Sequence, residues 1–224
     1  MNAEATRLES VWVGRDGGLL AEMLAFYAPR AQRVVDVCCN AKRIWKGSSW
    51  ERRVVGYDID AAVNPDVVCG WDALPDADAT VDVLVYDPPH LPVAAASPMS
   101  MQRFAEDFGL GRSVKADNIG ATHGPLLAEA KRVLRPDGLL FAKIKDYIHN
   151  HRYQWNLEFF NAAVRVAGLT PCDLVIKRDP AAGNLRSGRW ERAHHARNVH
   201  CYWVVVRNGR CEPRLREPQP AKHD

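Results

Sequence analysis

The chain has 224 residues, of which 47% are hydrophobic and 25% are charged, and its net charge is +3 with a pI near 8.5. It is long enough to bury one sizeable core. No segment reaches the ~18 consecutive apolar residues of a membrane span, and the N-terminal MNAEATRLES lacks the basic-then-apolar pattern of a secretory signal. These features favour a cytoplasmic protein without a membrane partner. We expect one domain over residues 1–208 and a disordered tail, rich in Pro and charge, over residues 209–224.

Strand-like and helix-like segments alternate along the chain. A first helix is expected over residues 18–27, where apolar residues recur at helical spacing. Seven short apolar runs predict strands at 33–39, 53–60, around Val67, 81–87, 139–146, around 174–179 and 200–207. Two further helices are expected over 124–134, closed by the turn at 135–138, and over about 154–167. Helices between the early strands and a loop-linked final pair predict a Rossmann-like α/β sheet with an antiparallel last strand.

The six cysteines favour reduced thiols over a disulfide framework. Cys38 and Cys39 stand side by side in an apparent buried strand, where small apolar side chains fit well. A zinc site would have to come from His194, His195, His200 and Cys201. No second pair completes four ligands at the usual spacings, so no metal is predicted.

The strand over residues 81–87 ends in the tetrapeptide DPPH, residues 87–90. Its apolar, β-branched composition is typical of a strand buried on both faces of a parallel sheet. The two prolines stop that strand because they donate no ladder hydrogen bonds and fix φ. The carboxylate of Asp87 is therefore left at the carboxyl end of a buried strand, where open α/β sheets bind ligands. Residues 92–123 have mixed turn and helix signals and are expected to form an active-site loop with one short helix.

Acids recur at the first four predicted strands. Asp36 lies on the first strand, and Asp58 ends the second, 22 residues later. Asp72 follows the third strand in the sequence GWDALP, and Asp87 ends the fourth. This order resembles that of class I S-adenosylmethionine (AdoMet) methyltransferases. The resemblance implies a mostly parallel seven-stranded sheet with an antiparallel last strand and helices on both faces, and AdoMet as the cofactor.

The same resemblance implies roles for these residues in cofactor binding. In the family the first acid orients the methionine part of AdoMet through the following loop, the second binds ribose, and the third accepts from the adenine amine. These roles are carried to Asp36, Asp58 and Asp72. Trp71 is expected beside the adenine. The loop after the first strand contributes Cys38 and Asn40.

One departure from the family concerns that loop, which usually reads DxxxGxG. The two glycine positions are Asn40 and Lys42 here. Asparagine tolerates the left-handed conformation that glycine would adopt. Lys42 would either pair with the AdoMet carboxylate or occlude the site. A relative that binds nucleic acid without binding AdoMet is therefore one alternative.

The DPPH tetrapeptide resembles the [DNS]PP[YFWH] motif of amino-group methyltransferases, which act on exocyclic base nitrogens. The lone pair of such an amine is delocalised into the ring, so the enzyme must localise it. Asp87 and the carbonyl of Pro88 would accept from the NH2 group, and Pro88 and Pro89 would hold both acceptors rigidly. His90 stands where an aromatic side chain normally stacks on the base.

A narrower resemblance is carried by DVCCNAKRIWKG, YDID, DPPHL, AKIKD and HARNVHCYWVVVR. These segments are similar to small bacterial and phage-borne DNA methyltransferases that have no separate target-recognition domain. The likeness implies DNA as the partner.

A basic segment between the last two strands is the candidate nucleic-acid contact. It includes Arg186, Arg189 and Arg192, with Trp190 interleaved. Basic side chains would neutralise phosphates, and an aromatic ring could stack or wedge at an extruded base. Lys145, at the end of the fifth strand, is a further candidate for substrate binding. The segment could also be ordinary solvated surface, and Lys145 could simply alternate with Lys143 along its strand.

These observations predict an AdoMet-dependent N-methyltransferase of an exocyclic base amine, with adenine N6 of DNA first and cytosine N4 next. An RNA or small-molecule N-methyltransferase would have the same site. A nicotinamide-dependent oxidoreductase would also have an acid ending strand two, but it needs a glycine-rich first turn and leaves DPPH unexplained.

Overall fold

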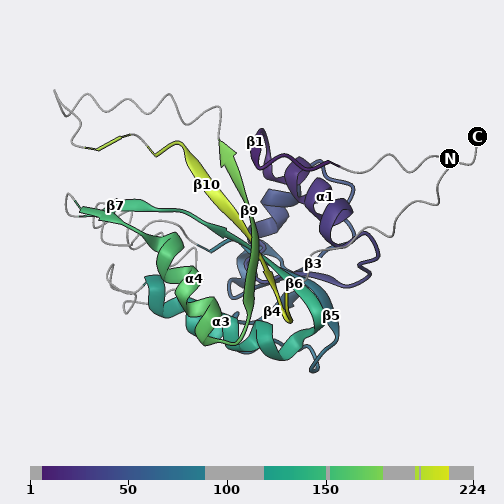
Figure 1. Ribbon diagram of the computed structural model, residues 1–224. Helices are drawn as coiled ribbons and strands as arrows, with labels where there is room; N and C mark the ends of the chain where they lie inside the picture. The colour runs from purple at the N-terminus through teal and green to yellow at the C-terminus, as the bar shows by residue number, and fades with distance from the viewer. Residues whose placement is uncertain (1–6, 89–118, 150–151, 179–194, 197, 212–224) are drawn as a thin grey trace, which may run out of the picture.

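The computed structural model describes residues 7–88, 119–149, 152–178, 195–196 and 198–211. Eight strands form one sheet in the order β1-β9-β10-β6-β5-β2-β3-β4 (Figure 1). The strands are β1 Val11–Val13, β2 Val34–Asp36, β3 Val55–Asp58, β4 Val67–Val68, β5 Val81–Tyr86, β6 Leu134–Ile144, β9 Thr170–Arg178 and β10 His200–Arg207. The helices are α1 Asp16–Tyr27, α3 Ile119–Val133 and α4 Asn156–Val166, with 3-10 turns η1 Asn40–Trp45 and η2 Ala61–Val63.

The Rossmann-like arrangement expected from the sequence is confirmed, with one strand more than the seven predicted. Strand β10 runs antiparallel to both of its neighbours, β6 and β9, whereas β2 to β6 pair in parallel. The additional strand is β1, which pairs in parallel with β9 at the sheet edge, with Val11 opposite Ile176. A separate hairpin, β7 Tyr147–His149 and β8 Arg152–Gln154, follows β6.

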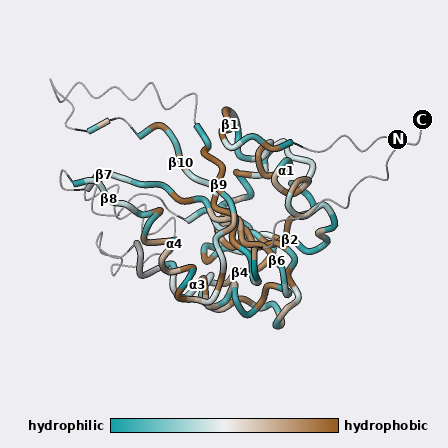
Figure 2. Tube along the Cα trace, in the orientation of Figure 1, coloured by the Kyte–Doolittle hydropathy of each residue, from teal (hydrophilic) through white to brown (hydrophobic). Residues whose placement is uncertain are grey.

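Helices cover both faces of the sheet, as expected (Figure 1). Apolar residues of α1, among them Leu20 and Leu24, pack in one core cluster with Val83 and Val85 of β5. Helices α3 and α4 pack in the other cluster with Leu84 and Tyr86 of the same strand. Alternate residues of β5 therefore enter opposite cores, which is why its sequence is apolar at nearly every position. Figure 2 shows the hydrophobic colour concentrated along the central strands.

Two connections differ from expectation. After β2 the chain forms the short turn η1, and the four residues 135–138 form a bulge inside β6, across which the pairing with β5 shifts register. Asp137 in that bulge has a φ of 64°. A bulge inserts residues into one strand without ending the ladder. The turn signal in the sequence was therefore correct, but the strand begins before it.

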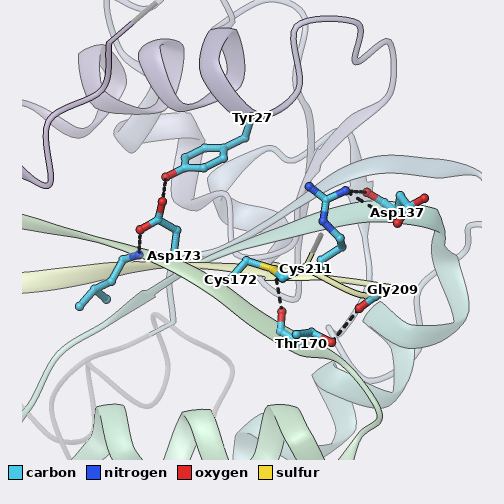
Figure 3. Close-up of a disulfide and its surroundings, with 9 residues drawn as sticks. Tyr27, Asp137, Thr170, Cys172, Asp173, Gly209 and Cys211 are labelled. Carbon is cyan, nitrogen blue, oxygen red and sulfur yellow. Dashed lines mark hydrogen bonds and ion pairs between the residues drawn. A yellow bond between two sulfur atoms is a disulfide. The ribbon is translucent and has the colours of Figure 1, made fainter. Parts of the chain in front are cut away.

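A disulfide joins Cys172 of β9 to Cys211 (Figure 3). Cys38 and Cys39 are free, in line with the expectation of reduced thiols there. For Cys172 and Cys211 that expectation was wrong. Close by, the Thr170 hydroxyl donates to the carbonyl of Gly209 at 2.7 Å. The chain is thus held against β9 as far as Cys211, two residues beyond Gly209. Among the described residues, no helix is long and apolar enough to cross a membrane.

Candidate active site

The predicted acids meet at one edge of the sheet. Asp36 and Asp58 are the last residues of the parallel strands β2 and β3, and Asp87 directly follows β5. In the register of the sheet, Asp36 lies opposite Val85 of β5. Parallel strands bring their carboxyl ends together, so three carboxyl groups that are far apart in sequence lie at the same end of the sheet. Asp87 and Asp58 both help to raise the pKa of Asp36, which shows that their charges are close to it.

The loop after β2 has the left-handed backbone that glycine would favour. Asn40, Ala41 and Lys42 have φ values of 39°, 54° and 56°. The amide of Cys39 donates to the carbonyl of Tyr57, and the amide of Asn40 donates to Asp58 Oδ2 at 2.9 Å. The expected left-handed asparagine is therefore found, and two main-chain amides tie the loop to the end of β3, one through the Tyr57 carbonyl and one through the Asp58 carboxylate.

The Lys42 ammonium is bound by groups of the protein itself. Its ammonium donates to the carbonyl of Val54 at 2.9 Å and pairs with Asp66 at 2.7 Å. Val54 precedes β3, so the lysine side chain runs toward the amino end of that strand, away from Asp58 at its carboxyl end. Its Cε passes Gly56, where an added Cβ would lie 3.0 Å away. Lys42 therefore anchors the loop at the amino end of β3.

Asp36 lies beneath this loop with no exposed surface. The indole of Trp45 in η1 donates to its Oδ2 at 2.7 Å, and the amide of Cys38 donates to its Oδ1 at 3.2 Å. Burial raises the pKa of Asp36 to about 7, although both hydrogen bonds lower it. The carboxyl group thus shapes the loop from below, which agrees with an indirect role in orienting a ligand.

Asp58, Trp71 and Asp72 follow one another along the same edge. Asp58 accepts from the amides of Asn40 and Asp60, and its carbonyl accepts from the amide of Cys69 at the end of β4. Trp71 is half-buried, and its ring meets that of Tyr86 edge-on at 5.9 Å. Asp72 is exposed beside it. A flat ring next to an exposed acceptor is suited to an adenine with its amine.

Asp87 belongs to a charge network that was not predicted. Lys143 of β6 donates to Asp87 Oδ2 at 3.1 Å and to Asp16 Oδ2 at 3.2 Å. Lys177 of β9 also pairs with Asp16 Oδ2, at 3.0 Å, and the indole of Trp203 donates to Asp16 Oδ1. Lys143 and Lys177 interrupt largely apolar strands, which indicates buried charges. Nothing in the sequence identified Asp16 as their partner.

A second polar network lies below the site. The Tyr86 hydroxyl is 3.3 Å from His123 Nδ1, and His123 Nε2 is 3.2 Å from Asn156 Oδ1. Asn156 in turn donates to the carbonyl of Lys145, whose side chain is half-buried at the end of β6. The next residue, Asp146, accepts from the amide of Leu157 in the first turn of α4 at 2.9 Å.

Pro88 is buried, directly after Asp87. The other predicted residues lie outside the described part of the chain: Pro89, His90, Arg186, Arg189, Trp190 and Arg192. Within the described ranges, no group of three or more His, Cys, Asp or Glu residues is placed to hold a metal ion. Burial raises the pKa of Cys39 to about 12 and that of Cys38 well above its usual range, so both thiols of the loop stay neutral.

Several solved structures are similar to this chain in fold. A Haloferax volcanii protein assigned as a methyltransferase, solved in complex with the Trm112 methyltransferase activator, has a TM-score of 0.52 at 17% identity, over 88% of this chain and 90% of that one. A Bacillus halodurans protein, also assigned as a methyltransferase, has a TM-score of 0.50 at 12% identity, over 85% and 99%. TrmN from Thermus thermophilus has a TM-score of 0.51 at 12% identity, over 85% of this chain and 48% of its own.

Neither a protein-family model nor a curated protein matches the sequence. At such low identities, the structural likeness establishes the fold. It is the Rossmann-like class I methyltransferase fold expected from the order of the acids.

Proposed function

We propose that this protein is an AdoMet-dependent N-methyltransferase that acts on an exocyclic amine of a nucleic-acid base, with adenine N6 of DNA as the first candidate and cytosine N4 as the second. The observation that carries the proposal is the position of Asp87. Its carboxylate ends β5 beside a buried proline and shares an edge of the sheet with Asp36 and Asp58. A rigid hydrogen-bond acceptor next to a cofactor loop is what methylation of a weakly nucleophilic amine requires.

The residues at the carboxyl edge fit AdoMet. The left-handed turn at residues 40–42 would receive the methionine part, Asp58 the ribose hydroxyls, and Trp71 with Asp72 the adenine. Bound AdoMet supplies an electrophilic methyl group on a sulfonium. Since Lys42 is anchored at the amino end of β3, the loop can offer its backbone groups to the ligand.

Asp87 would act on the substrate amine. Its carboxylate accepts from one N–H, and the carbonyl of Pro88 accepts from the other, which concentrates the lone pair on nitrogen. His90 would stack on the base at the following position. We assign contact with the nucleic-acid phosphates to Arg186, Arg189 and Arg192, and an auxiliary contact to Trp190 and Lys145.

Transfer of labelled methyl from AdoMet to duplex DNA, single-stranded DNA and bulk RNA, assayed in parallel, tests the reaction and its substrate. Asp87→Ala should lower transfer about 100-fold or more while AdoMet still binds. Asp58→Ala should weaken AdoMet binding about tenfold or more, since a hydrogen bond to a charged group is lost. Asp78→Ala, an exposed acid paired with Arg132 elsewhere on the surface, is the matched control and should change neither.

Incorporation of labelled methyl into DNA that disappears with Asp87→Ala supports the proposal. Incorporation into RNA alone would support the reaction but identify RNA as the substrate in place of DNA. Calorimetry that detects DNA binding but no AdoMet binding would identify a nucleic-acid-binding relative without catalytic activity, and would refute the proposal.

A further inference from the structure

We infer that Lys143 is a positioning residue for methyl transfer, which keeps Asp87 ionised and oriented when substrate fills the site. The inference rests on the proposed function and adds to it a residue outside the motif. Lys143 lies on β6, the strand next to β5, with 12% of its side chain exposed. Its ammonium is 3.1 Å from Asp87 Oδ2, so the pair is in direct hydrogen-bonding contact.

Lys143 is itself held from the other side. Asp16 Oδ2 accepts from it at 3.2 Å, and Asp16 is fixed in turn by Lys177 and by the indole of Trp203. The Trp203 ring also lies 5.7 Å from the ammonium. Burial lowers the pKa of Lys143, but Asp87 and Asp16 outweigh this and raise it. The lysine therefore stays charged in one position against Asp87.

The need for such a cation is visible at the same edge of the sheet. Asp36 is buried and receives its hydrogen bonds from Trp45 and from a backbone amide instead of a lysine, and burial raises its pKa to about 7. A nucleic-acid base and AdoMet bound over Asp87 would exclude water from its carboxyl group, as burial does for Asp36. A carboxyl group that became protonated there would lose its charge and turn one oxygen into a donor, so it would hold the amine and the lysine less strongly.

The pairing also assigns the proton. The amine nitrogen bonds to the methyl carbon as the bond from that carbon to the sulfonium sulfur breaks, and the nitrogen then carries one proton too many. A carboxylate that is bound to an ammonium is a poor base, because the cation favours its ionised form. Asp87 thus orients the amine, and the surplus proton passes from nitrogen to water.

The pH dependence of single-turnover transfer tests this role. Several titratable groups surround the Asp87–Lys143 pair: Asp16 on α1, Asp36 and Cys38 at the end of β2, Asp58 on β3, Lys177 on β9 and Cys201 on β10. Burial raises the pKa of Cys201 to about 11, and that of Cys38 well above its usual range, so neither thiol ionises between pH 6 and pH 9. Burial raises the pKa of Asp36 to about 7, so Asp36 also titrates in this range and each variant is compared with the wild-type profile.

Lys143→Met should add an acid limb to the profile. Transfer should be lost at low pH relative to the wild type, because Asp87 without its cation is protonated more readily, whereas transfer at pH 9 is largely retained. Lys143→Arg should restore the wild-type profile. Lys177→Met is the matched control: it removes an equally buried lysine from Asp16 without touching Asp87, so any loss of rate should be the same at every pH.

Removing one lysine leaves two carboxylates with less compensation, and the fold itself could suffer. The double variant Asp16→Asn, Lys143→Met keeps the net charge of the network and should show the same acid limb. A wild-type profile in either folded variant would overturn the role of Lys143 alone. A wild type that transfers no methyl and binds no AdoMet would overturn the proposed function, and this inference with it.

Discussion

Replacing Gly56 by alanine should weaken the fold and AdoMet binding together. Gly56 is in β3, under the loop that follows β2. A Cβ at this position would lie 2.9 Å from both Cβ and Sγ of Cys39, and 3.0 Å from Cε of Lys42. Neither neighbour is free to move. Cys39 is 1% exposed and its amide is bonded to Tyr57, while the Lys42 ammonium is bound to Val54 and Asp66.

The expected magnitude follows from two opposing effects. Adding a methyl group to a closely packed site costs about 1–3 kcal/mol in displaced side chains and backbone. Alanine in place of glycine regains about 0.4–1 kcal/mol by restricting the unfolded chain. The free energy of unfolding should therefore fall by about 1–2 kcal/mol, which for a chain of this size lowers Tm by roughly 2–8 °C. The added methyl group would push the turn at residues 39–42 outward. If AdoMet binding must return the turn to its original position, the affinity falls about tenfold for each 1.4 kcal/mol that this return costs.

Urea unfolding and calorimetric titration with AdoMet measure both effects. Gly124→Ala is the matched control, because its added Cβ would meet no atom within 4 Å on the exposed face of α3. It should leave AdoMet binding unchanged, since Gly124 lies on α3, away from the loop after β2. A Gly56→Ala protein as stable as the wild type would refute the expected clash, and a loss of stability with unchanged AdoMet affinity would refute its effect on the loop.

Three further changes test other parts of the structure. The pKa of Asp36 is raised from 3.8 to about 7, so its contribution to stability is complete below about pH 4 and is lost as the pH rises through 7. Between pH 5 and pH 8, the free energy of unfolding of the wild type, measured with urea, should fall with rising pH more steeply than that of Asp36→Asn. The difference should reach about 1 kcal/mol per pH unit. Cys172→Ser should lower the unfolding free energy by about 3–4 kcal/mol without reductant. In reductant the two proteins should match, and a persistent difference would mean that the disulfide is not the cause. Neutralising Arg186, Arg189 and Arg192 together should flatten the salt dependence of DNA binding, and an unchanged slope would count against this contact.

The central strands and their terminal acids could be predicted because both signals are local. Apolar runs such as Val81–Tyr86 identify buried strands, and an acid at the end of such a run must lie at the carboxyl edge of a parallel sheet. Strand β1 was not predicted, because it has only three residues and is held by pairing with β9. No periodicity can be read from so short a segment.

The charge network and the disulfide depend on tertiary pairing. Asp16 is 127 residues from Lys143 and 161 from Lys177, and nothing near any of the three indicates its partner. Cys172 and Cys211 are 39 residues apart in sequence, and one of them lay in the segment expected to be a tail. Contacts of this kind follow from the order of the strands, which local patterns do not encode.

The loop after β2 shows why the missing glycines do not by themselves argue against cofactor binding. A left-handed conformation costs an L-residue about 1–2 kcal/mol, and three consecutive residues adopt it here. Bonds from the Asn40 amide to Asp58 and from Lys42 to Asp66 and Val54 offset that cost. The glycine that the packing requires is Gly56, in the strand beneath the loop. A turn held by tertiary contacts is ordered before the ligand arrives, so AdoMet binding would spend less of its free energy on ordering this loop.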